Sequence, residues 1–99
     1  MNRHEFDNLA LTATDDVVAF AKFVQRTEFL FAGSSDADSL KCYQGAWFEV
    51  EIVNAAALAA WGDDGRPVKW DYEWRSLYQS SASEVITLLK DAARPFLTT

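Results

Sequence analysis

The side chains that most often act as nucleophiles or metal ligands are scarce in this chain. His4 is the only histidine, and no Cys or His lies at metal-ligand spacing from it. Cys42 is the only cysteine, and a nucleophilic thiol needs a neighbouring base, which a histidine in the N-terminal segment is poorly placed to supply. We therefore expect His4 to be an exposed terminal residue and Cys42 to be a buried packing residue.

Two carboxylate pairs are the next candidates for chemistry. Glu49 with Glu51, and Asp71 with Glu73, are each separated by two positions. On a helix such a pair points about 200° apart, whereas on a strand it shares one face. General acid–base cooperation therefore requires strands in these segments. We expect all four to be solvated surface charges.

Binding loops for metals or phosphates are not evident in the sequence. The segment Asp63-Asp64-Gly65 lacks the alternating oxygen ligands and the closing glutamate of a calcium loop, and is better explained as a turn. The four glycines, Gly33, Gly45, Gly62 and Gly65, do not form a phosphate-binding pattern. We expect no catalytic residues, no metal, no cofactor and no enzymatic activity.

The charge balance is acidic. The 99 residues contain 15 Asp and Glu against 9 Lys and Arg, which gives a formal charge of -6. Nucleic-acid binding needs a basic surface, so the balance argues against it and favours a basic protein partner. A single cysteine cannot form an internal disulfide, and no long apolar run or signal segment is present, which predicts a cytoplasmic protein without membrane contact.

Aromatic residues are the strongest unexplained feature, at 14% of the chain with four Trp. On a helix, Trp70 and Trp74 share a face and are expected in the core, while Tyr72 points outward between charged neighbours. Exposed Tyr and Arg are typical of protein interfaces. The sequence therefore predicts a partner-contact patch made of Asp63, Asp64, Asp71, Tyr72, Glu73 and Arg75.

The chain has the length of one domain, residues 1–99, with turn residues at 32–35 and 62–67. Thr14-Asp15-Asp16 supplies a helix cap, and apolar residues then recur at helical spacing, which predicts a helix over about 15–30. Weaker spacing from Phe6 to Ala13 is compatible with a short extra turn or helix.

The middle segment predicts one long helix over about 36–61. A row that is apolar except for Asn54 steps by three and four, and it consists of Leu40, Tyr43, Trp47, Val50, Asn54, Ala57 and Trp61. A second apolar row follows beside it, formed by Phe48, Ile52, Ala56 and Ala59. A helix with two apolar sides needs neighbours on both, which favours self-association. Residues 47–53 also alternate as a strand does.

The C-terminal third predicts helices over about 67–79 and 82–94. Pro67 suits a first helical turn, and Ser81-Ala82-Ser83-Glu84 resembles a capping box. The expected fold is an all-α, elongated bundle of three to four helices. The alternative is a small α+β domain with strands near 47–53 and 68–74.

No motif identifies a family, and three functional hypotheses follow. The first is a non-enzymatic, acidic protein-interaction module that associates with itself, forming a homo-oligomer, or binds a basic protein. The second is a small acidic inhibitor, of the phage anti-defence or toxin-immunity type, that blocks a nucleic-acid-binding site. The third is a small-ligand carrier or enzyme subunit with an apolar pocket.

Overall fold

The computed structural model describes residues 1–98 and is all-helical in that range. The helices are α1 (Arg3–Leu11), α2 (Val17–Thr27), α3 (Ala37–Asp63), α4 (Asp71–Leu77) and α5 (Gln79–Ala93), followed by the 3-10 turn η1 (Arg94–Phe96). The predicted all-α bundle is confirmed. The alternative with strands near 47–53 and 68–74 is wrong, since both segments contain helix and no strand forms within residues 1–98.

The long middle helix α3 is continuous over 27 residues. Asp36 caps it by accepting a hydrogen bond from the Ser39 backbone N–H at 3.1 Å. It ends where Gly65 adopts a positive φ of 85° and the Arg66 N–H donates to the Trp61 carbonyl at 2.9 Å. No helix within residues 1–98 combines the length and apolar character needed to span a membrane.

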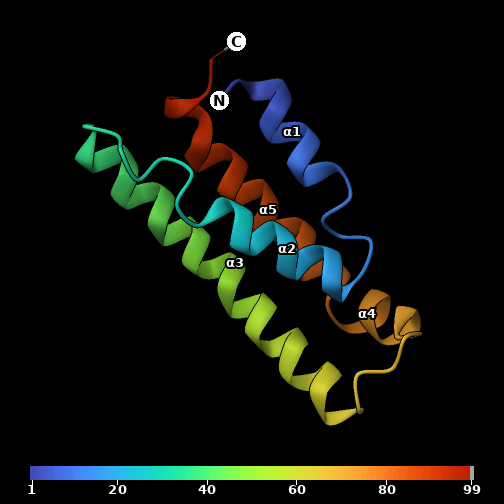
Figure 1. The fold of residues 1–99 in the computed structure, drawn as a ribbon. Helices are drawn as coiled ribbons and strands as arrows, with labels where there is room; N and C mark the ends of the chain where they lie inside the picture. The colour runs from blue at the N-terminus through green and yellow to red at the C-terminus, as the bar shows by residue number, and fades with distance from the viewer. Residues whose placement is uncertain (99) are drawn as a thin grey trace.

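The other helices gather on one side of α3 (Figure 1). Its main contacts are with α5 and α2, and α4 folds back against α5. The molecule measures 43 × 22 × 18 Å, so the elongated shape expected from the long helix is confirmed.

The first apolar row of α3 faces the core. Four of its members are buried, Tyr43, Val50, Asn54 and Ala57, and the other three pack at its margins, Leu40, Trp47 and Trp61. The Trp47 indole N–H also donates to the Val24 carbonyl of α2 at 3.0 Å. The spacing of this row therefore identified the buried side of the helix correctly.

The predicted short N-terminal helix is α1, and it docks through few contacts. Its Phe6 is fully buried, edge-on to Phe23 of α2. Asp7 forms an ion pair with Lys90 of α5 at 2.6 Å. The Arg3 N–H donates to the Thr98 carbonyl at 2.9 Å, which holds the two described ends of the chain side by side (Figure 1).

The predicted helix boundaries require three corrections. The helix expected over 15–30 spans 17–27, because the backbone turns after Thr27. The helix expected from residue 67 begins at Asp71, since the indole N–H groups of Trp61 and Trp70 bind the Pro67 carbonyl and the Asp64 carboxylate and hold the intervening segment as a loop. The break before α5 falls at Tyr78, so the segment 81–84 lies inside that helix.

Candidate interaction surface

The second apolar row of α3 is exposed. We define the outer face of α3 as the six exposed apolar positions Gly45, Phe48, Ile52, Ala55, Ala56 and Ala59. Phe48 is 59% exposed and Ile52 is 50% exposed. Both lie on the side of the helix turned away from the seam that contacts α2 and α5. The sequence predicted that this second row needs a neighbouring element, and no element within residues 1–98 covers it.

Charge is nearly absent from this surface. Between Gly45 and Gly62 the only charged residues are Glu49 and Glu51. Glu51 is half-buried and accepts a hydrogen bond from the Asn54 amide at 3.3 Å, so it belongs to the core side. Glu49 is exposed at the edge of the outer face. A helix that is apolar on all sides is normally buried on all sides, so the exposed apolar side of α3 is a candidate contact surface.

Two shallow grooves flank the N-terminal half of the outer face. One, of about 400 Å³, lies between α3 and α5, and its apolar lining includes Cys42, Gly45 and Leu88. The prediction that Cys42 is a buried packing residue is wrong, because the thiol is exposed at this groove. The other, of about 260 Å³, lies between α3 and the segment that follows α2, where Phe29 is 73% exposed.

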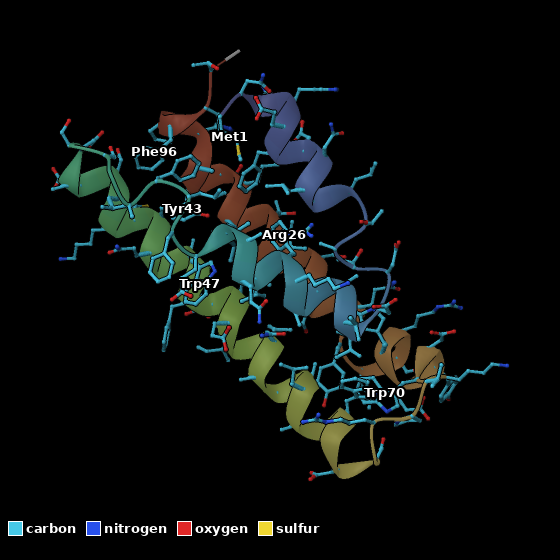
Figure 2. All side chains as sticks on the ribbon, viewed as in Figure 1. Met1, Arg26, Tyr43, Trp47, Trp70 and Phe96 are labelled. Carbon is cyan, nitrogen blue, oxygen red and sulfur yellow. The ribbon has the colours of Figure 1, made fainter. Side chains whose placement is uncertain are left out.

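The six residues predicted to contact a partner all lie at one end of the molecule. They occupy the C-terminal end of α3 and the helix α4, beside Trp70 (Figure 2). Tyr72 is 79% exposed, and the predicted burial of Trp70 and Trp74 is confirmed. Glu73 is only half-exposed. Asp64 has a structural role, because its carboxylate accepts the Trp70 indole N–H at 2.8 Å.

The carboxylate pairs cannot act together as acid and base. Glu49 and Glu51 lie on α3, and Asp71 and Glu73 lie on α4, so the members of each pair point to different sides of a helix. His4 is exposed on α1, as predicted. No group of three or more His, Cys, Asp or Glu side chains within residues 1–98 is arranged to hold a metal ion.

The ionisable groups with shifted pKa values belong to the scaffold. Burial raises the pKa of the Tyr43 phenol above its ordinary value of 10.0. The hydrogen bond from Lys90 lowers the pKa of Asp7, and the hydrogen bonds from Ser39 lower the pKa of Asp36. These groups anchor helices and lie apart from the outer face of α3.

Comparison with known proteins gives no relative: no protein-family model, no curated protein and no solved structure matches the chain. The exposed surface of the molecule is therefore the source of functional information. Sequence reasoning identified Phe48, Ile52, Ala56 and Ala59 as a row but missed the contributions of Phe29 and Leu88, which come from other elements. Helical periodicity can group residues on one helix but cannot show which separate helices extend its surface.

Proposed function

We propose that this chain is a non-enzymatic protein-interaction module and that the outer face of α3 docks against a helix of another protein chain. The observation that carries the proposal is the row of exposed apolar residues on α3, in which Phe48 and Ile52 remain at least half exposed. Large apolar side chains are the usual anchors of helix recognition, at spacings of three and four positions. Phe48 and Ile52 have that spacing.

The free energy that the outer face can contribute to docking is moderate. Full burial of a Phe or Ile side chain stabilises a complex by about 1.5–3 kcal/mol. Phe48 and Ile52 have already buried part of their surface against α3 itself. Each therefore has roughly 1 kcal/mol left to contribute on binding. Alanines beside them allow a partner helix to approach closely, which strengthens dispersion contacts.

The acidic charge supports a second element of the proposal, the selection of partners. With a formal charge of -6, the chain attracts basic surfaces and repels acidic ones. Asp63 and Asp71 are exposed at the end that also carries Tyr72. Charges at the margin of an interface act chiefly on the rate of encounter. We infer that this end steers a basic protein partner toward the molecule.

The two other hypotheses have less support. A phosphate mimic needs carboxylates free of neighbouring bases, yet Arg66, Lys69 and Arg75 are interspersed with the acids of this end. For a ligand carrier, the cavity beneath Trp61 and Trp70 has a volume of about 100 Å³, and the larger hollows are shallow grooves that are open to solvent. Typical ligand sites measure about 300–1,000 Å³, so this cavity is too small for most metabolites.

Site-specific photo-cross-linking tests the proposal. A photoreactive amino acid replaces Ile52 on the outer face, or Leu11 on α1 as a control whose apolar side chain is more exposed, at 77% against 50%. In cells that express the chain, we expect position 52 to form a discrete protein adduct that is lost when Phe48→Glu is added. Position 11 should form none. Equal adducts at both positions, or none at position 52, would contradict the proposal.

A further inference from the structure

We propose that the occupant of the outer face of α3 is the same face of a second copy, packed antiparallel to the first. The inference rests on the proposed function and specifies which helix docks on the outer face; the basic protein drawn to the acidic end of the molecule is a separate partner. Three properties of the described residues carry it: the distribution of large and small side chains along α3, the charges near its two ends, and the polarity of the helix.

The side-chain sizes along the outer face are unequal. The large residues Phe48 and Ile52 come first, and the small residues Ala55, Ala56 and Ala59 follow. In an antiparallel pair with its two-fold axis between positions 53 and 54, Phe48 lies level with the partner's Ala59. Ile52 then lies level with the partner's Ala55. Large side chains meet small ones along the whole contact, which is the self-complementarity that a two-fold interface requires.

The same register also brings the glycines of the two helices together. Gly45 lies level with the partner's Gly62, and a Cβ added at either residue would meet nothing within 4 Å in the isolated chain. Positions without side chains let two helix backbones approach more closely than the usual separation of about 8–10 Å. A parallel pair would instead place Phe48 against Phe48 and leave the alanine half loosely packed.

Charges near the ends of α3 favour the same orientation. Lys41 and Asp63 are exposed, and their helical positions place them on the side of the outer face. The antiparallel register puts Lys41 about one helical turn from the partner's Asp63, within reach of a lysine side chain. The positive N-terminal end of each α3 also lies beside the negative C-terminal end of the other. A parallel pair would bring the two Asp63 carboxylates together.

The size of the contact predicts a reversible dimer. From Lys41 to Asp63 the helix extends about 33 Å, at about 1.5 Å per residue. A contact through one helix face of this length buries an area at the lower end of the range for specific interfaces. Phe29 and Leu88 border the grooves beside α3 and widen the apolar surface that a second copy would cover.

Sedimentation equilibrium of the full chain, taken into the millimolar range, tests the inference. We expect a concentration-dependent dimer whose dissociation constant rises more than tenfold in Phe48→Glu, since each substitution occurs twice in a symmetric dimer. Leu11→Glu, on α1, should leave it unchanged. A strictly monomeric chain would overturn the second copy as occupant. The proposed function would survive that result if position 52 still formed adducts with a different protein, and would fall if it formed none.

An exchange of side-chain size tests the register. Phe48→Ala and Ala59→Phe should each weaken the dimer, the first by leaving a void and the second by opposing two phenylalanines. The double variant Phe48→Ala/Ala59→Phe restores one large residue against one small one and should recover most of the wild-type dissociation constant. If the two effects simply add in the double variant, positions 48 and 59 do not face each other and the register is wrong.

Single cysteines test the orientation in a Cys42→Ser background, which removes the native exposed thiol. In the antiparallel register Ala55 lies about 5 Å along the axis from its counterpart, whereas Ala59 lies about 16 Å from its own. Mild oxidation should therefore cross-link the Ala55→Cys variant and leave the Ala59→Cys variant uncross-linked. Efficient cross-linking of both variants would indicate parallel helices and overturn the inference.

Discussion

The phenolic hydroxyl of Tyr43 donates a hydrogen bond to the backbone carbonyl of Thr27 at 2.5 Å, with both residues buried. This bond joins the first half of α3 to the last residue of α2. The Thr27 hydroxyl in turn donates to the Phe23 carbonyl at 2.8 Å, so the end of α2 is held by polar contacts inside an apolar core. A buried polar group that loses its hydrogen-bond partner destabilises the folded state. Substitutions that break this contact should therefore lower the free energy of unfolding.

Tyr43→Phe should destabilise the protein by about 1 kcal/mol at neutral pH, because it removes the hydroxyl and leaves the Thr27 carbonyl with one fewer partner. Urea unfolding followed by circular dichroism measures the change. Tyr72→Phe, at a residue 79% exposed, is the matched control and should be neutral. Equal effects of the two substitutions would contradict the role assigned to Tyr43.

Alkaline pH should destabilise the fold through the same residue. Burial raises the pKa of Tyr43 in the folded state, so the unfolded chain loses this proton first. The stability contribution is complete below the unfolded value of 10.0 and declines as the pH rises above it. Tyr43→Phe should have a shallower loss of unfolding free energy above pH 10 than the wild type, whereas Tyr72→Phe should not. Identical slopes in wild type and Tyr43→Phe would contradict the prediction.

Acidic pH should destabilise the fold by protonating Asp36, the residue that caps α3. The Ser39 hydroxyl and then the Ser39 backbone N–H donate hydrogen bonds to the Asp36 carboxylate and lower its pKa, so the stabilisation is present above the unfolded value of 3.8. It is lost as the pH falls through the lowered folded value. Asp36→Ala should therefore unfold at lower denaturant than the wild type at pH 7, and the difference should shrink in strong acid. A difference independent of pH would contradict this role.

Asn54→Leu should increase the unfolding free energy by about 1–2 kcal/mol. Asn54 is 6% exposed, and its side-chain oxygen is buried without a hydrogen-bond partner among the described residues. A leucine of similar length removes that unpaired group and adds apolar contacts to the seam. Chemical unfolding compares Asn54→Leu with Asn54→Asp, which should be strongly destabilised by the buried charge. A loss of stability in Asn54→Leu would show that the amide is satisfied in solution.

The salt dependence of binding distinguishes a second copy of the chain from a basic protein as the partner. Each copy carries a formal charge of -6, so two copies repel each other and the dimer should strengthen as salt screens that repulsion. A complex with a basic protein should weaken over the same range. Sedimentation at low and high ionic strength measures the first effect. A dimer that weakens steeply with salt would place the main attraction in charge pairs rather than in Phe48 and Ile52.

The parts of the fold that follow from local rules could be predicted from the sequence. The apolar row from Leu40 to Trp61 fixed the course and buried side of α3 to within two residues at each end. Asp16 occurs in the predicted cap and does accept a hydrogen bond from the Ala19 N–H, at 2.7 Å. Both features depend on residues close in the sequence, where helical geometry leaves few alternatives.

The start of α4 and the environment of Cys42 depend on tertiary contacts and could not be predicted in this way. Pro67 suits a first helical turn, but the hydrogen bond from Trp61 to its carbonyl holds it in a loop. Cys42 lies on a helix that is apolar on several sides, so composition could not show which side the chain leaves uncovered. Phe48, Ile52, Ala56 and Ala59 were predicted as a row in need of a neighbour, and only the positions of α2 and α5 show that the row is exposed within residues 1–98.

The four tryptophans supply a built-in optical readout of this architecture. Their indole N–H groups bind the Val24 carbonyl, the Pro67 carbonyl, the Asp64 carboxylate and the Thr14 carbonyl. The indoles therefore hold three junctions: Trp47 joins α3 to α2, Trp61 and Trp70 hold the loop before α4, and Trp74 holds the link that precedes α2. Variants that retain one tryptophan at a time would let fluorescence report which junction loosens first when the molecule is heated or engaged.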